Sequence, residues 1–284
     1  MYANLSLKDK IPHITPIIPV YFVIIEVVFT MNYYVIFNNQ ANRFIRILSL
    51  IFFEPLAILT IITHLKSMFT NPGYVPIPFQ QIITSPKDNN SREQYCKQCN
   101  NPRPQRSHHC KVCKKCTLKM DHHCPWIANC VGYYNQKNFY QFLFCASFGD
   151  FFGFIFILIQ FMNTDISIKN NIPNNIKITS PFTLIYYMWG PIQIVIGGLC
   201  ALAVTIGVGT LFYKQTYMLL NNQTTIDKKQ YEIWENSPYY EKDQMKSFCS
   251  VLGNNFCDWI SLKFEGNDPY YLDRNKGYVT LENV

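Results

Sequence analysis

The most informative part of the chain is YCKQCNNPRPQRSHHCKVCKKCTLKMDHHCPWIANC, residues 95–130, which holds seven cysteines and four histidines. Its two Cys-x-x-Cys pairs, Cys96/Cys99 and Cys110/Cys113, each place two thiolates on one tight turn, as tetrahedral zinc requires. Thiols crowded beside histidines in a reducing loop indicate metal binding and not disulfides. A segment this short has little apolar core, so metal binding would supply its folding energy.

A count of ligands predicts that some of these side chains stay free. Two closed tetrahedral sites need eight ligands, and the stretch offers eleven candidates. Cys124 is the best candidate for a free thiol, because it ends the run Asp121-His122-His123-Cys124. A neighbouring imidazole can take the thiol proton, and a carboxylate can orient that imidazole, which is the arrangement of covalent catalysis.

Apolar runs lie on both sides of this stretch. A helix that crosses the hydrocarbon core needs about 20 apolar residues, and residues 14–37, 44–65, 139–162 and 184–212 meet this condition. They predict an α-helical integral membrane protein with four transmembrane helices. Glu26 and Glu54 fall inside the first two runs, where carboxylates are costly. They serve either a polar contact near a site or helix packing.

The distribution of Lys and Arg predicts the orientation. Residues 66–138 carry 11 of them, which favours a cytosolic middle loop. The expected organisation is 1–65 for the N-terminus and helices 1–2, 66–138 for a cytosolic Cys-rich domain, 139–213 for helices 3–4 with a lumenal loop at 163–183, and 214–284 for a cytosolic tail. Both termini are then cytosolic. The net charge of +7 would also suit a nucleic-acid binder, but the apolar runs favour a lipid bilayer and no nucleic acid.

The Cys/His pattern resembles that of the DHHC-type zinc-finger protein S-acyltransferases, also called palmitoyltransferases. Their pattern is Cys-x2-Cys-x9-His-Cys-x2-Cys-x2-Cys-x4-Asp-His-His-Cys-x5-Cys, and the chain matches it at every position. The likeness extends to Pro125-Trp126, Asn129, Gly132, Asn135 and Phe139. A four-span plan with the motif between spans two and three is also similar to the family.

The resemblance implies two structural Zn²⁺ ions. The first site would use Cys96, Cys99, His109 and Cys116, and the second would use Cys110, Cys113, His123 and Cys130. His122 would be the general base, Asp121 would orient it, and Cys124 would be the nucleophile. The implied reaction transfers a palmitoyl group from acyl-CoA to Cys124, and from there to cytosolic cysteines of membrane-associated substrate proteins.

The resemblance also suggests residues that meet the acyl-CoA. The acyl chain would contact Trp126, Phe139, Phe142 and Gly149, and the CoA phosphates would meet Arg103, Arg106, His108 and Lys119. Ordinary packing is the alternative for the aromatics, and a generic basic cytosolic face is the alternative for the cations. Because Gly149 has no side chain, we expect it to permit chains of sixteen or more carbons.

Two segments after the last span resemble family motifs less closely. Thr224-Thr225-Ile226-Asp227 stands where the family has Thr-Thr-x-Glu, and the threonines are expected to support Asp121. In residues 246–253, Ser247 stands where asparagine is usual; the alternative for this segment is a short amphipathic element at the membrane surface. Cys249 and Cys257 are either free thiols or lipid-modified.

Rival interpretations remain open at the level of sequence. One is a purely structural zinc module, and another is a catalytically inactive, zinc-stabilised membrane scaffold or adaptor. The family's usual location is the Golgi or another endomembrane, with the plasma membrane as an alternative. The sequence does not identify the protein substrates.

Overall fold

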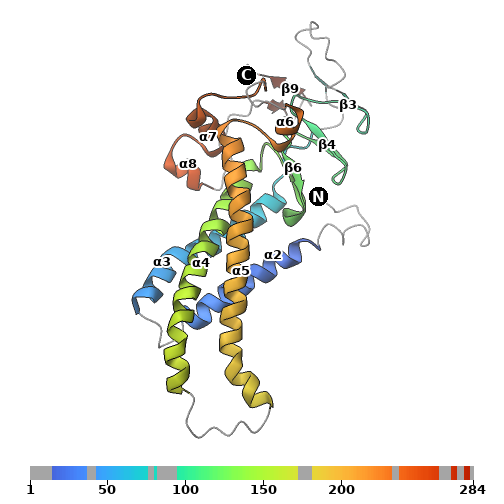
Figure 1. Cartoon of the computed structure of the whole chain (residues 1–284). Helices are drawn as coiled ribbons and strands as arrows, with labels where there is room; N and C mark the ends of the chain where they lie inside the picture. The colour runs from blue at the N-terminus through green and yellow to red at the C-terminus, as the bar shows by residue number, and fades with distance from the viewer. Residues whose placement is uncertain are drawn as a thin grey trace. The chain divides into compact units, whose positions relative to one another are not determined.

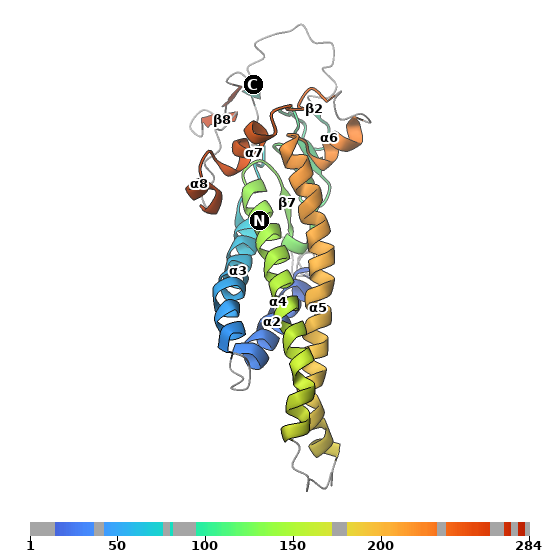
Figure 2. The ribbon, with the colours of Figure 1, turned by 60° about the vertical axis from the view of Figure 1, so that its left-hand side comes forward.

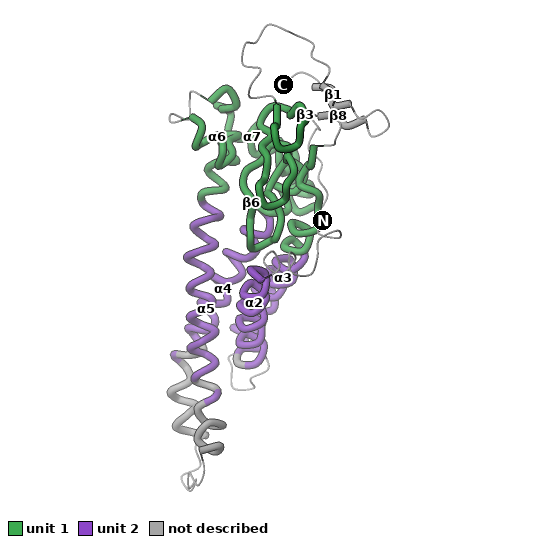
Figure 3. The backbone as a smooth tube through the Cα atoms, turned by 90° about the vertical axis from the view of Figure 1, so that its right-hand side faces the viewer, with its two compact units in different colours: residues 1–14, 63–140, 214–284 green, residues 15–62, 141–213 purple. Residues whose placement is uncertain are grey.

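The computed structural model describes residues 15–36, 43–75, 80–81, 95–171, 181–231, 237–261, 270–273 and 278–281. The chain forms two compact units, coloured separately in Figure 3. Unit 1 comprises Met1–Ile14, Thr63–Tyr140 and Lys214–Val284, and unit 2 comprises Thr15–Ile62 and Gln141–Tyr213. Each unit is described below by itself.

Most of the described chain is helical (Figure 1). The helices are α2 (Ile17–Met31), the π-helical turn η1 (Asn32–Ile36), α3 (Arg43–Phe69), α4 (Gln136–Asn171), α5 (Pro181–Leu220), α6 (Thr225–Gln230), α7 (Gln244–Leu252), α8 (Phe256–Ile260) and the 3-10 turn η2 (Pro125–Ile127). The strands are β1 (Gln80–Gln81), β2 (Tyr95–Cys96), β3 (Asn101–Pro102), β4 (His108–Cys110), β5 (Lys115–Thr117), β6 (His122–Cys124), β7 (Asn129–Val131), β8 (Tyr270–Asp273) and β9 (Tyr278–Leu281).

Three of the helices are long and apolar enough to cross a membrane. They are α3, the part Gln136–Ile159 of α4 and the part Ile192–Leu220 of α5. The first apolar run forms the shorter α2, which has 15 residues, so the fourth span stays a prediction. Helix α4 continues to Asn171, beyond the expected end of the third span, because residues 163–171 contain no glycine or proline.

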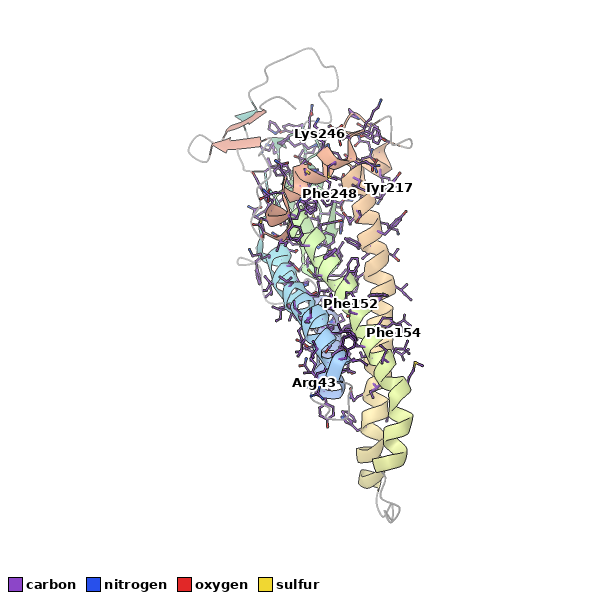
Figure 4. All side chains as sticks on the ribbon, turned by 90° about the vertical axis from the view of Figure 1, so that its left-hand side faces the viewer. Arg43, Phe152, Phe154, Tyr217, Lys246 and Phe248 are labelled. Carbon is purple, nitrogen blue, oxygen red and sulfur yellow. The ribbon has the colours of Figure 1, made fainter. Side chains whose placement is uncertain are left out.

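Unit 2 has one hydrophobic cluster, to which α2, α3, α4 and α5 all contribute. Its buried members are Val27, Met31, Val35, Phe53, Phe156, Ile157, Ile194 and Ala201. Phe152 of α4 packs against this cluster and points toward α3 (Figure 4), with its ring 5.4 Å from that of Phe52. Asn32 donates a 3.0 Å hydrogen bond to the Glu54 carboxylate. Glu54 therefore contacts a neighbouring helix, which agrees with the helix-packing interpretation; the interpretation that it serves a site stays a prediction.

Glycines set the helix contacts in unit 2. A Cβ at Gly149 would lie 3.4 Å from the Cβ of Leu56, and a Cβ at Gly153 would lie 3.1 Å from the ring of Phe53. The two glycines are four residues apart on α4, which is the small-xxx-small spacing that lets membrane helices approach closely. Helix α3 thus packs against this glycine edge of α4.

Gly197 of α5 makes the tightest of these contacts. A Cβ there would lie 2.4 Å from Oγ1 of Thr30 on α2, too close for any rotamer of a fully buried, β-branched neighbour. We expect Gly197→Ala to destabilise the protein by about 1–3 kcal/mol through overpacking. Thermal unfolding of the purified protein in detergent measures this.

The matched control for Gly197 is Gly207, on the same helix. No atom lies within 4 Å of a Cβ at Gly207, so Gly207→Ala should be neutral or raise the melting temperature through helix propensity. Equal melting temperatures for the two variants would contradict the assigned contact.

Unit 1 contains small sheets and the tail helices. The strands pair as the antiparallel hairpins β2–β3, β4–β5 and β6–β7, and β1, β9 and β8 form a three-stranded sheet. Figure 2 shows α7 and α8 next to one another, and the ring of Phe248 on α7 lies 5.2 Å from that of Trp259 on α8.

Side chains at the start of α4 and the end of α5 hold the tail. Lys137, which is 1% exposed, donates from Nζ to the carbonyl of Asp258 at 2.7 Å. The Tyr140 ring lies 6.3 Å from that of Phe248. Ser247 donates its hydroxyl to the carbonyl of Leu219. The serine that replaces the family's asparagine is therefore used to dock α7 against α5.

Candidate active site

Three successive hairpins of unit 1 arrange the residues that could hold metal ions. In β4–β5, His109 pairs with Cys116, and in β6–β7, His123 pairs with Cys130. The turn of the β2–β3 hairpin holds Cys99, one residue before Asn100, whose φ is 48°. Each hairpin thus supplies a cross-strand His/Cys pair or a Cys-x-x-Cys turn, and the β4–β5 hairpin supplies both.

The first group of ligand atoms belongs to Cys96, Cys99, His109 and Cys116, which lie within 4.8 Å of one another. Nδ1 of His109 is 3.2 Å from Sγ of Cys99 and 3.5 Å from Sγ of Cys96, and the thiols of Cys99 and Cys116 are 3.8 Å apart. Tetrahedral zinc, with bonds of about 2.3 Å to sulfur and about 2.0 Å to nitrogen, separates such ligands by about 3.5–3.8 Å. The group can hold a metal ion and fits zinc.

The second group has the same form and consists of Cys110, Cys113, His123 and Cys130, again within 4.8 Å. Nδ1 of His123 is 3.4 Å from Sγ of Cys113, and the thiols of Cys113 and Cys130 are 3.5 Å apart. The amide of Cys113 donates to Sγ of Cys110 at 3.3 Å, a bond that favours the thiolate. These two groups are the ones that the family resemblance implies.

Strand alternation separates the two neighbouring histidines. His122, His123 and Cys124 are consecutive on β6, and successive side chains of a strand point to opposite faces. His123 points to the second metal-binding group, so His122 and Cys124 share the other face, where the Cys124 thiol is close enough to raise the pKa of His122. Cys124 is 5% exposed and belongs to neither group.

Asp121 orients His122. Oδ2 of Asp121 accepts from Nδ1 of His122 at 2.7 Å, and its side chain is 3% exposed. This bond leaves Nε2 for the thiol. Burial disfavours the charged imidazole, but the hydrogen bond to Asp121 and the neighbouring Cys124 thiol outweigh this effect and raise the pKa of His122 to about 10. Burial also opposes ionisation of Asp121, yet His122, Thr225 and Gln215 hold its pKa below the ordinary value.

The two threonines have different roles. The backbone amide of Thr225 donates to Oδ1 of Asp121. Thr224 instead caps α6: its hydroxyl accepts from the amide of Asp227 at 3.1 Å, and its own amide donates to the Asp227 carboxylate at 2.9 Å. The aspartate that replaces the family's glutamate therefore completes a capping box.

The turn after Cys124 is held by α3. Nε2 of His64, a fully buried residue, lies 3.1 Å from the carbonyl of Trp126. The side-chain amide of Asn129 donates to two carbonyls, that of Met68 in the last turn of α3 at 3.1 Å and that of Thr70 just after it at 2.9 Å. Last-turn carbonyls of a helix lack intrahelical partners. Asn129 satisfies them and fixes the turn at the same time.

Two of the cations expected to meet CoA have different surroundings in the structure. Arg106, whose side chain is 10% exposed, forms a 2.6 Å ion pair with Asp227 and donates to the carbonyl of Asn222 at 2.9 Å, and Tyr239 covers it at 4.5 Å. Arg106 thereby ties the Cys-rich hairpins to the segment after α5. Burial and the charge of Arg106 lower the pKa of Lys119 to about 7.

The remaining residues expected at the acyl-CoA lie in different parts of the fold. The ring of Phe139 meets that of His122 edge-to-face at 5.6 Å, and Trp126 is 49% exposed. Arg103 and His108 lie in the Cys-rich hairpin region of unit 1, whereas Phe142 and Gly149 belong to unit 2. Contacts of all these residues with acyl-CoA stay predictions.

Two residues of the site were not predicted from sequence. Gln215 of α5 donates to Asp121 at 2.9 Å, and His64 contacts Trp126 as described above. His64 is a polar side chain inside an apolar run, whereas Gln215 lies just after the end of one. Neither position identifies the partner of the side chain.

A family model described as DHHC palmitoyltransferase matches residues 89–232, half of the 284-residue chain. The chain belongs to the DHHC palmitoyltransferase family. With its apolar helices, this membership indicates a membrane protein. The matched range includes both metal-binding groups, the Asp121-His122-His123-Cys124 run, and all of α4, α5 and α6.

Several curated relatives of this DHHC protein carry family names. A protein of Arabidopsis thaliana named "Probable protein S-acyltransferase 15" is 29% identical over 233 residues, which cover 78% of this chain and 85% of the relative. Palmitoyltransferase ZDHHC3-A of Danio rerio is 28% identical over 194 residues (66% and 58%). Palmitoyltransferase ZDHHC6 of Homo sapiens is 29% identical over 206 residues (69% and 49%).

Proposed function

We propose that this protein is a protein S-acyltransferase that moves a long-chain fatty acyl group, such as palmitoyl, from acyl-CoA to a cysteine of a membrane-associated protein. The observation that carries the proposal is the arrangement on β6. Cys124 lies outside both metal-binding groups and beside His122, and Asp121 holds that imidazole at 2.7 Å. Cys124, His122 and Asp121 are therefore placed to act as nucleophile, base and orienting carboxylate.

The first half-reaction acylates the enzyme. His122 takes the proton of Cys124, and the thiolate attacks the thioester carbonyl of acyl-CoA. The bond between the acyl carbon and the CoA sulfur breaks, and the CoA thiolate receives the proton from His122. The product is a thioester on Cys124. Asp121 keeps the imidazole in the tautomer that presents Nε2 to the thiol and stabilises the imidazolium.

The second half-reaction transfers the acyl group. The thiol of a substrate protein loses its proton to His122 and attacks the same carbonyl, and Cys124 leaves and recovers the proton. One thioester replaces another in both steps, so the free energy changes little. Positioning of the reactants is therefore what the enzyme supplies.

The proposal includes two structural zinc ions. The eight ligands would be the two Cys3His groups of unit 1. Bound zinc supplies folding free energy to a segment that has little apolar core. Cys124 and His122 are left for the chemistry because neither is needed as a ligand.

The membrane accounts for the choice of substrate. Burial of each CH₂ group is worth about 0.8 kcal/mol, so an acyl chain of sixteen carbons prefers hydrocarbon strongly. We propose four spans, with the Cys-rich domain and both termini on the cytosolic side, the acyl chain in the bilayer and CoA in water. The abundance of Lys and Arg in residues 66–138 supports this orientation.

The test uses purified full-length protein and an alkyne analogue of palmitoyl-CoA. We expect a label that neutral hydroxylamine removes, that maps to the peptide containing Cys124, and that passes to an acceptor protein with a cytosolic cysteine. Unlabelled wild-type protein would overturn the proposal and favour a zinc-stabilised scaffold. No specific observation favours the scaffold at present, and all catalytic positions of the family motif are filled.

Chain length offers a separate prediction at Gly149. We expect Gly149→Tyr to shift the preference toward shorter acyl-CoA, measured with a series of acyl-CoA lengths. Because a Cβ at Gly149 meets Leu56 at 3.4 Å, the variant also tests helix packing. The control is Gly209→Tyr, where a Cβ meets no atom within 4 Å. A lower melting temperature with an unchanged length profile would assign Gly149 to packing and refute the chain-length role.

A further inference from the structure

Gln215 lies near the end of α5, 94 residues from Asp121 in the sequence, and its Nε2 donates to Oδ2 of Asp121 at 2.9 Å. The same oxygen accepts from Nδ1 of His122 at 2.7 Å. The other carboxylate oxygen accepts from the amide of Thr225. An ionised carboxylate accepts through both oxygens, so Asp121 is held by three donors from three segments of unit 1.

We propose that Gln215 is a positioning residue of the acyl transfer, which acts on His122 through Asp121. The inference rests on the proposed function. The donor at this position is a neutral side-chain amide. It fixes the plane of the Asp121 carboxylate without adding a charge beside it. A Lys or Arg at this place would neutralise Asp121 and remove its attraction for the imidazolium. Gln215 therefore fixes the orientation of the Asp121 carboxylate, and the negative charge of Asp121 remains available to stabilise the His122 imidazolium.

The surroundings of Gln215 support a specific role. Its neighbour Thr216 shares a 3.1 Å hydrogen bond with Tyr140 of α4, and Phe139 meets His122. The end of α5 thus contacts Asp121 through Gln215, and the start of α4 contacts His122 through Phe139. Asp121 is 2% exposed, so water cannot readily replace a lost donor. Hydrogen bonds to charged groups contribute more than neutral ones.

The experiment measures single-turnover formation of the Cys124 thioester with full-length protein over a range of palmitoyl-CoA concentrations. We expect Gln215→Met to lower the rate constant at saturation about 10- to 100-fold, with the half-saturating concentration unchanged. Gln215→Glu, which has the same shape but brings an acceptor to Asp121, should lose at least as much. Lys214→Met, a change at an exposed neighbour on the same helix, should keep the wild-type rate.

A double-mutant cycle with Asp121→Asn separates positioning from general support of the fold. If Gln215 acts through Asp121, Gln215→Met should cost less than threefold in the Asp121→Asn background. Full additivity, or a wild-type rate in Gln215→Met, would overturn the inference while the proposed function stands. If wild-type protein forms no thioester on Cys124, the proposed function falls and takes this inference with it. Zinc content and melting temperature should stay at wild-type values in Gln215→Met, and loss of either would also count against a positioning role.

Discussion

Cys124→Ser is expected to abolish the hydroxylamine-sensitive acyl label while the protein keeps two zinc ions. A serine hydroxyl is a far weaker nucleophile than a thiolate, and loss of a nucleophile costs at least about 10⁴-fold in rate. The thiol is 5% exposed and belongs to neither metal-binding group, so the nearly isosteric serine should leave the fold intact. Labelling with the alkyne palmitoyl-CoA and metal analysis of the same sample measure both effects.

The control for Cys124 is a second thiol outside the site. Cys257 of α8 is exposed, and Cys257→Ser should keep the label on Cys124. Label on the Cys124→Ser protein that hydroxylamine still removes would assign the acyl thioester to another cysteine. Label that resists hydroxylamine would indicate an oxyester on the introduced serine, which is compatible with the site but very slow.

Cys110→Ala is expected to remove one zinc ion per chain and to destabilise the Cys-rich hairpins. Cys110 is 2% exposed and lies in the second metal-binding group. Structural zinc contributes about 10–16 kcal/mol of binding free energy in small zinc domains, which matches or exceeds the stability of a typical domain. The affected segment should become sensitive to protease, and acyl transfer should be lost with it.

The zinc contents of two cysteine variants together test the ligand assignment. Cys124→Ser should retain both ions, whereas Cys110→Ala should retain one or none. Two zinc ions in Cys110→Ala would refute the ligand assignment. Fewer than two in the wild-type protein, after purification without chelators, would refute it as well.

Most of the predictions about the family and the site came from the Cys/His stretch, residues 95–130. A Cys-x-x-Cys spacing restricts two thiols to one turn by covalent geometry alone, and the period of a strand separates His122 from His123 without any distant contact. Family membership, an acyltransferase chemistry and three of the apolar spans follow from such local patterns. The grouping of the eight ligands was implied by the resemblance, and the structure brings the same residues into two groups within 4.8 Å.

Contacts between residues far apart in the chain could not be predicted from the sequence. Arg106 was expected at CoA, and the structure pairs it with Asp227, 121 residues away. Gly149 was expected to leave room for an acyl chain, and the structure adds a close approach to Leu56. In both cases the residue type was informative, because a cation needs a partner and a glycine permits proximity. The partner depends on how the helices and hairpins pack.

Local sequence was enough to predict the membrane-helix character of the chain, the thiol and imidazole donors of the Cys-rich stretch, and Cys124 as the thiol left outside the two metal-binding groups. These features depend on local spacing, because the backbone keeps residues that are close in sequence close in space. Other contacts depend on tertiary packing: Gln215 and the backbone amide of Thr225 donate to Asp121, His64 contacts the turn after Cys124, and Thr30 meets Gly197. These contacts join segments that approach only when whole helices pack, and that packing depends on the sum of many weak interactions along each helix.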